Sequence, residues 1–236
     1  MITKKKLAIL VAGEFREFEN AHLSWSFLDM DNDFFISTWD TSIEQNSKLN
    51  INIKESVTSD RILKYIPHAI INIEPDTTNS NNSIKQRYHW RKVFEMADNT
   101  GVEYDNVIVI RPDLKIVQKR DFNSFINNIN NSFIYAISGI VIQPPPSFVY
   151  INDQLFLGKY NIVKDAILSF PKFDISKYCI HYHIAKHFVN NDIYVESLYN
   201  IISALVMRSS HRDKLHLPIE DQFRIETEWF DAKNSN

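Results

Sequence analysis

The sequence predicts an α/β protein, a sandwich of helices around a mostly parallel central sheet. Short, fully apolar segments such as 7–12 and 107–110 are typical of strands that are buried on both faces. These segments alternate with helical patterns, an order that favours strand–helix–strand units. No internal repeat and no linker rich in glycine or proline divides the 236 residues, so we expect a single domain over 1–236.

The first half of the chain alternates between predicted strands and helices. Segment 7–12 predicts a first strand, which Gly13 ends. The spacing of Ala21, Trp25 and Leu28 predicts the inward face of a helix over 19–29. The elements predicted next are a strand over 33–40, a polar variable loop over 41–56, a short helix over 59–66, a strand over 68–73 and a helix over 83–99 that Gly101 closes.

The second half begins with the buried strand over 107–110 and is predicted to become more helical. Pro112 has no backbone N–H, so the chain is expected to leave the sheet there. The elements predicted after it are a helix over 121–129, a strand over 133–137 that can extend to 143, a stiff proline loop at 144–146, a segment over 150–158 that begins polar and turns into an apolar strand after residue 154, helices over 162–170, 176–189 and 193–207, and a last short strand over 223–225.

Arg111 and Asp113 flank Pro112 at the carboxyl end of a predicted buried strand. Ligands of open α/β sheets bind at this edge. A carboxylate oxygen is a ligand that hard cations prefer, so Asp113 is a candidate to hold Mn²⁺ or Mg²⁺. Such a metal would neutralise a diphosphate.

Two further strand ends carry candidate binding residues. Gly13 and Arg16 follow the first strand, and this pairing suits a phosphate or nucleotide contact. Asp40 ends the second strand, at the same edge of the predicted sheet. Gln86 lies four residues before Trp90 on an apolar helical stripe, where its amide needs partners. Those partners are either the backbone or a ligand.

Polar side chains in the second half supply candidates for the acceptor side. Asn152–Gln154 stand directly before an apolar strand and suit either sugar hydroxyls or a capped turn. Glu196 lies in the first turn of the helix predicted over 193–207, where a carboxylate favours the helix dipole. His183 and His187 have the spacing of a helical metal pair, although a solvated or packed helix face explains them better, and His211 is a further possible ligand.

Composition narrows the class of protein. The net charge of −3 and the even spread of Lys and Arg predict no nucleic-acid surface. No segment reaches the length of about 18 apolar residues that a membrane span needs. Cys179 is the single cysteine, which excludes an internal disulfide and favours a reducing compartment. We therefore expect a cytoplasmic protein.

Taken together, these motifs resemble small glycosyltransferases of the GT-A fold, a Rossmann-type αβα sandwich. The resemblance rests on the order and spacing of five segments over residues 7 to about 200: 8–16, 35–40, 86–90, 104–114 and 152–158. The chain is most similar to members found in phages, large viruses and capsule or lipopolysaccharide gene clusters. Its compact size suggests a phage-encoded member, acting in the cytoplasm of a bacterial or phage-infected cell.

The resemblance implies transfer of a hexose from a nucleotide-diphosphate sugar to a saccharide acceptor, with Mn²⁺ or Mg²⁺ assisting. A UDP-sugar is the expected donor, and UDP-glucose is the first expectation. Residues 1–118 would form the nucleotide-sugar-binding half, and residues 119–236 the acceptor-binding half. In such an enzyme a cation stabilises the leaving diphosphate. A carboxylate base acts on the acceptor hydroxyl if the reaction inverts the sugar.

Residue roles follow from the same resemblance. Arg111 stands where the family's Asp-x-Asp motif has its first Asp, so only Asp113 is left to ligate the metal, and Arg111 would contact phosphate or the donor sugar. The other candidates are Gly13, Arg16 and Asp40 facing the nucleotide, Gln86 facing the donor, Asp153 as acceptor ligand or catalytic base, and Glu196 as a second acceptor-side carboxylate.

Two other functions stay open at this point. A nucleotidyltransferase would use the same edge for a nucleoside triphosphate, but it calls for a second metal-binding carboxylate near Asp113. A non-catalytic nucleotide-sugar-binding domain would explain the missing first Asp and predicts binding without turnover.

Overall fold

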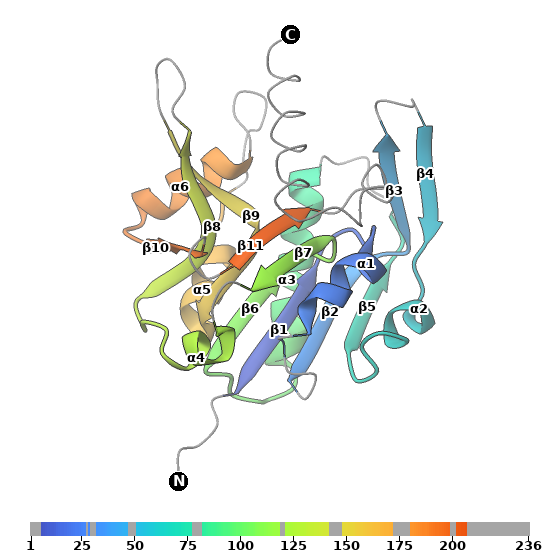
Figure 1. Ribbon diagram of the computed structural model, residues 1–236, viewed down its shortest axis with the longest axis horizontal. Coiled ribbons are helices and arrows are strands. Elements are labelled where there is room, and N and C mark those ends of the chain that lie inside the picture. Colours follow the sequence, from blue (N-terminus) through green and yellow to red (C-terminus); the bar gives the residue numbers. More distant parts are fainter. Residues whose placement is uncertain are drawn as a thin grey trace.

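The computed structural model describes residues 6–26, 28, 32–46, 51–76, 82–118, 121–141, 148–171, 180–198 and 202–206. A seven-stranded sheet of order β10-β8-β9-β6-β1-β2-β5 forms its centre (Figure 1). The strands are β1 (Leu7–Ala12), β2 (Asp33–Trp39), β5 (Ile70–Glu74), β6 (Asn106–Ile110), β8 (Phe133–Val141), β9 (Phe148–Lys159) and β10 (Tyr194–Ser197). Only β9 pairs antiparallel with its neighbours, so the predicted mostly parallel α/β sheet is confirmed.

The apolar strands are buried on both faces of this sheet. Along β1, residues 7, 9 and 11 belong to one hydrophobic core, and residues 8, 10 and 12 belong to the other. This split follows from the two-residue period of a strand. Helices α3 (Asn82–Asp98), α5 (Tyr160–Leu168) and α6 (Ile180–Asn190) cover one face, while α1 (Phe18–His22), the 3₁₀ turn Leu23–Trp25, α2 (Ser59–Leu63) and α4 (Phe122–Asn127) contribute to the other.

The predicted inward stripes of the first half are confirmed. Ala21, Trp25 and Leu28 are all buried in the core beside β1, although the α-helix there is shorter than predicted. On α3, the apolar residues that the pattern placed inward are buried as well: Trp90, Val93, Phe94 and Ala97. Gly101 follows α3 with a φ of +70°, the left-handed conformation that commonly ends helices.

Two small antiparallel sheets contain segments that the sequence predicted as a loop and as a helix. The segment predicted as a variable loop over 41–56 contains the pair β3 (Thr41–Asn46) and β4 (Ile51–Ser56). The helix predicted over 193–207 is wrong, because β10 lies there instead and is followed by β11 (Ile202–Val206), which pairs with β7 (Leu114–Gln118). In both cases the strands pair with partners that periodicity within one segment does not reveal.

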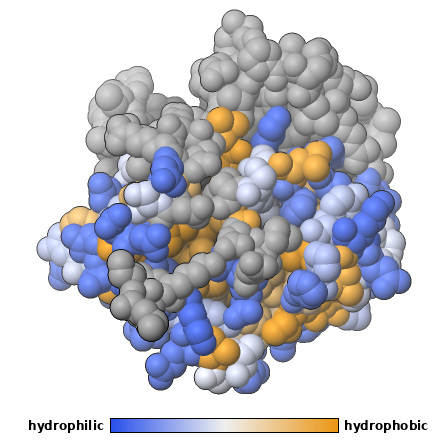
Figure 2. Space-filling view, turned by 60° about the horizontal axis from the view of Figure 1, so that its bottom comes forward, coloured by the Kyte–Doolittle hydropathy of each residue, from blue (hydrophilic) through white to orange (hydrophobic). Residues whose placement is uncertain are grey.

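Several predicted features lie outside the described residues. These are the proline loop at 144–146, the start of the helix predicted over 176–189, His211 and the strand predicted over 223–225. In the described part, no helix combines the length and apolarity that crossing a bilayer requires. Hydrophilic and hydrophobic side chains are interspersed over the described surface that Figure 2 draws.

The strand order places a topological switch point between β1 and β6. From β1 the chain passes to β2 and β5 on one side, and then returns to β6 on the other side of β1. Both strands are parallel, so their carboxyl ends meet at one edge of the sheet. Ligands of open α/β sheets bind in the crevice outside this point. We therefore expect a ligand site at the residues that follow β1 and β6.

Candidate functional site

The turn after β6 buries a carboxylate against an arginine. β6 ends at Ile110 and β7 begins at Leu114 in a different sheet, as Pro112 predicted. Asp113 is fully buried. It accepts hydrogen bonds from Arg111 Nε at 3.0 Å and from Arg111 Nη2 at 2.8 Å. This two-pronged geometry fixes the plane of the guanidinium group.

Arg16 reaches the same carboxylate from the end of β1. Its Nε donates to Asp113 Oδ2 at 2.8 Å, and its Nη1 donates to Glu14 at 3.2 Å. Asp113 therefore joins two arginines that come from the two strands of the switch point. Within the described part of the chain, Arg16 Nη2 has no hydrogen-bond partner, and 15% of the Arg16 side chain is exposed. This Arg16 donor thus remains for a ligand.

Asp153 extends this cluster from β9. The residues 152–154 do not precede a strand, as the sequence suggested, but lie inside β9. On the β8 side, residues 152–155 stand opposite Ile137 alone, because the pairing passes from Ala136↔Phe156 to Ser138↔Ile151. Bulges of this kind re-aim side chains and are common beside active sites. Here the bulge places Asp153 Oδ2 3.6 Å from Arg111 Nη1.

Charge pairing decides the protonation of this cluster. Burial disfavours the charged Arg111 guanidinium, but Asp113 and Asp153 outweigh it, so the pKa of Arg111 lies above its ordinary value. Burial also works against an ionised Asp153. The Arg111 charge and a hydrogen bond from His181 outweigh that effect and lower the pKa of Asp153. Arg111 and Asp153 are therefore both charged at neutral pH.

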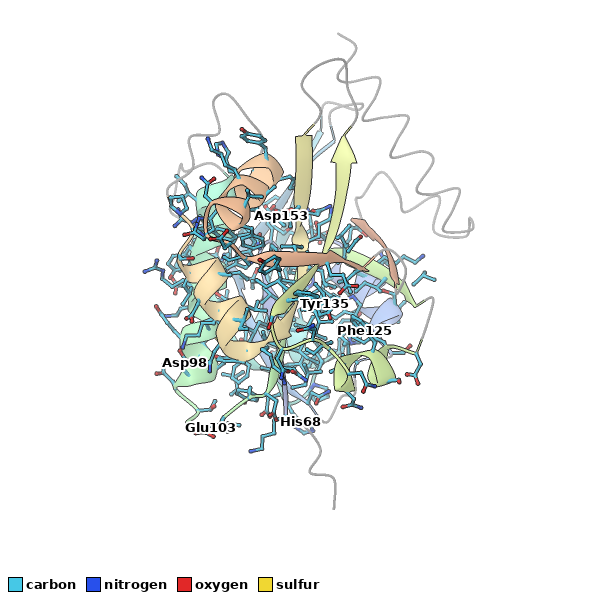
Figure 3. The ribbon with its side chains drawn as sticks, turned by 90° about the vertical axis from the view of Figure 1, so that its left-hand side faces the viewer. His68, Asp98, Glu103, Phe125, Tyr135 and Asp153 are labelled. Carbon is cyan, nitrogen blue, oxygen red and sulfur yellow. The ribbon has the colours of Figure 1, made fainter. Side chains whose placement is uncertain are left out.

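His181 is the member of the cluster that sequence reasoning missed. It lies in the first turn of α6, and its Nε2 is 3.1 Å from Asp153 Oδ1. Helix α6 packs against β9, and Figure 3 shows Asp153 next to that helix. The helical spacing drew attention to His183 and His187 instead. Nothing local in the sequence links His181 to an aspartate 28 positions earlier.

Gly13 and Gln86 meet beside the cluster, at the end of β1. Gln86 Nε2 donates to the carbonyl oxygen of Ala12 at 3.0 Å. Gly13 has a φ of +127°, which favours glycine, and a Cβ atom there would lie 2.7 Å from Gln86 Oε1 and displace that side chain. Of the two partners predicted for Gln86, the structure therefore shows the backbone. Donor contact by Gly13 and Gln86 stays a prediction.

Asp40 and Glu196 stand apart from this cluster. Asp40 Oδ1 accepts a hydrogen bond from the backbone N–H of Asp76 at 3.2 Å, which ties the end of β2 to the chain after β5. Glu196 is exposed on β10, where it pairs in register with Tyr135. Two strands, β8 and β9, separate it from β6. The helix dipole that motivated the choice of Glu196 does not exist there.

The described residues around Asp113 do not fit a divalent cation. Both carboxylate oxygens already accept hydrogen bonds from guanidinium groups, and two positive charges oppose a third. In the described ranges, no group of three or more His, Cys, Asp or Glu side chains lies together as a metal site. Metal ligation by Asp113 stays a prediction that this geometry does not favour.

Comparisons with known proteins do not place the chain in a family. No protein-family model matches the sequence, and no curated protein matches it. One solved structure that matches is the bifunctional IspDF from Campylobacter jejuni, at 11% identity and a TM-score of 0.48. The match covers 92% of this chain and 55% of that one, so this chain spans about half the length of IspDF. A likeness this distant carries no argument about function.

Proposed function

We propose that this chain is a glycosyltransferase that moves a hexose from a nucleotide-diphosphate sugar to a saccharide acceptor. The observation that carries the proposal is the convergence of Arg16 and Arg111 on Asp113 at the switch point of the sheet. Two guanidinium groups at this edge suit a diphosphate, which accepts hydrogen bonds from several donors at once. A UDP-sugar, with UDP-glucose first, is the donor we propose.

The arginines supply the positive charge in this proposal. As the bond between the sugar and the diphosphate breaks, negative charge grows on the leaving phosphate oxygen. Within the described cluster, Arg16 Nη2 and Arg111 Nη1 donate no hydrogen bond. In the proposed reaction their N–H groups would face that phosphate oxygen. Donors held in place before the reaction stabilise such charge without reorganising. No step therefore runs through a metal ion.

The acceptor side of the proposal rests on the β9 bulge. Asp153 and its neighbours stand beside Arg111, so an acceptor hydroxyl bound there would lie next to the donor sugar. Asn152 and Gln154 bring amide groups, which bind sugar hydroxyls well. We also propose a cytoplasmic protein, which the single cysteine supports.

The test is a thermal shift against a panel of UDP- and GDP-hexoses, in EDTA and in Mn²⁺. One nucleotide sugar should raise the melting temperature in both buffers, since a ligand at 100 times its Kd adds about 2.7 kcal/mol to the stability of the folded state. The variant Arg16→Met should lose most of this shift. Arg91→Met is the matched control, because Arg91 is exposed on α3 and should keep the full shift.

Other outcomes separate the alternatives. No shift with any nucleotide sugar contradicts the proposal. A shift without release of the nucleoside diphosphate in the presence of saccharides indicates a binding domain. Release of pyrophosphate from a nucleoside triphosphate and a sugar phosphate indicates a nucleotidyltransferase.

A further inference from the structure

An aspartate–histidine pair joins the β9 bulge to α6. His181 Nε2 lies 3.1 Å from Asp153 Oδ1, and the two groups come from elements that pack together. Their exposure differs, since the side chain of Asp153 is 10% exposed and that of His181 is 34% exposed. The aspartate thus lies inside the cluster, whereas the imidazole is the part of the pair that a substrate can reach.

The hydrogen bond sets the tautomer of His181. Asp153 is held ionised by Arg111, and an ionised carboxylate only accepts hydrogen bonds. When the imidazole is neutral, Nε2 must therefore carry the hydrogen, and Nδ1 keeps its lone pair. Nδ1 makes no hydrogen bond with any residue that the structure describes. This nitrogen is therefore able to accept a proton.

We propose that His181 is the general base of the transfer reaction and that Asp153 is its positioning residue. This inference rests on the proposed function. Asp153, which the sequence suggested as the base, is a weak one, because its charge is already stabilised by Arg111. His181 borders the same cluster, and its Nδ1 makes no hydrogen bond that would hold its lone pair within the described residues. The Asp153 carboxylate would then bind one nitrogen of the imidazole, and the other nitrogen would face the substrate hydroxyl. Many catalytic histidines are oriented by a carboxylate in this way.

His181 Nδ1 takes the proton of the acceptor hydroxyl while that oxygen forms a bond to the anomeric carbon of the sugar. The bond from this carbon to the diphosphate oxygen breaks, and its electron pair leaves with the nucleoside diphosphate beside Arg16 and Arg111. Asp153 stabilises the imidazolium that forms, and the imidazolium then releases its proton to water.

Other groups near the cluster are less suited to this role. Asp113 is fully buried and is held by two arginines. His187, on the same helix, is bonded to Ser169 and Asn191 rather than to the cluster. Glu196 lies on β10, beyond β8 and β9. Among these groups, only His181 has both a hydrogen bond to the cluster, through Nε2, and a second nitrogen, Nδ1, that can accept a proton.

The test measures nucleoside diphosphate release by the full chain from UDP- and GDP-hexoses, with simple hexoses and water as acceptors. His181→Ala and His181→Gln should each lower kcat by at least about 100-fold and leave the KM for the donor unchanged. Gln keeps a hydrogen bond to Asp153 but cannot act as a base, so it separates the two roles. Imidazole added to the solution should restore part of kcat in His181→Ala.

Three further measurements decide the result. Asp153→Asn should lower kcat as well, and imidazole should not restore it. His68→Ala is the control, because His68 is exposed at the end of the molecule opposite Asp153 and should leave kcat unchanged (Figure 3). If wild type is active and both His181 variants keep kcat within threefold, the base assignment is wrong while the proposed function stands. If wild type releases no diphosphate from any donor, both proposals fall.

Discussion

At the residue scale, the end of β1 requires a glycine, Gly13, which lies against Gln86 of helix α3. Gly13 has a φ of +127°, a conformation that L side chains rarely adopt. Its N–H donates to the carbonyl oxygen of Ser37 at 3.1 Å, which ties the end of β1 to β2. Gln86 lies over its Cα and binds the carbonyl oxygen of Ala12. Backbone shape therefore requires glycine, and a side chain there would also displace the Gln86 amide.

Gly13→Ala should lower the free energy of unfolding by about 3 kcal/mol, because alanine is strained at this φ and its methyl group displaces the Gln86 amide from its bond to Ala12. Gly101→Ala is the matched control. Gly101 also has a positive φ, but no atom lies within 4 Å of a Cβ built there, so its loss should be about 1 kcal/mol. Chemical denaturation of both variants measures the difference. Equal losses would show that the contact with Gln86 costs nothing.

At the element scale, the turn between β6 and β7 is held by charge rather than by packing alone. Its backbone bond from Leu114 N to Arg111 O is long at 3.3 Å, whereas Asp113 accepts three short side-chain bonds from Arg16 and Arg111. The 3₁₀ turn Leu23–Trp25 adds a bond of 2.7 Å from Trp25 Nε1 to the carbonyl oxygen of Leu114. The turn thus positions both arginines of the candidate site.

Asp113→Asn should lower the free energy of unfolding by about 3 kcal/mol, because it leaves two partly buried guanidinium groups without their shared carboxylate. Urea denaturation measures this loss. Glu95→Gln is the control, since it only opens an exposed pair with Lys92 at 3.8 Å and should change stability little. Mn²⁺ should not raise the melting temperature of wild type. A Mn²⁺ shift that Asp113→Asn abolishes would instead make Asp113 a metal ligand.

The misread elements share one cause. Segment 193–207 has apolar residues at helical spacing, yet β10 pairs with β8 and β11 pairs with β7. Segment 41–56 is mostly polar, and the alternation of Ile51 and Ile53 with polar residues is too short to mark the β3–β4 pair. Each of these strands is stabilised by hydrogen bonds to another segment. The residues of one short segment do not show which other segment it will pair with.

At the scale of the whole molecule, the direction of the chain brings the functional groups together. Six strands of the central sheet point the same way, and β9 runs against them. The carboxyl ends of β1 and β6 therefore lie side by side, and the bulge of β9 meets them from the opposite direction. One edge of the sheet collects charged groups from four segments, centred on residues 16, 111–113, 153 and 181.

Binding of UDP should slow amide hydrogen exchange at this edge alone. We expect protection in peptides covering 13–16 and 111–114, because bound phosphate would restrain both loops. Peptides covering 101–105 and 128–132 lie at the amino edge of β6 and β8 and serve as internal controls. Mass spectrometry of the free and UDP-bound protein measures both sets. Protection confined to the amino edge would contradict the location of the site.

Local patterns in the sequence predict the parts of this protein that depend on near neighbours in the chain. Apolar runs and helical stripes predicted β1, β6 and α3 with their buried faces, and Pro112 predicted where the chain leaves the sheet. These features depend on neighbours a few residues away, so the sequence carries them directly.

The contacts between polar side chains at the candidate site are visible only in the folded protein. It placed Arg16 and Arg111 on one carboxylate, moved Glu196 onto an exposed strand and joined Asp153 to His181. These contacts link residues far apart in the chain, and the pairing of strands and a bulge in β9 set them. Because no local periodicity records such pairing, the candidate base became visible only in the folded protein.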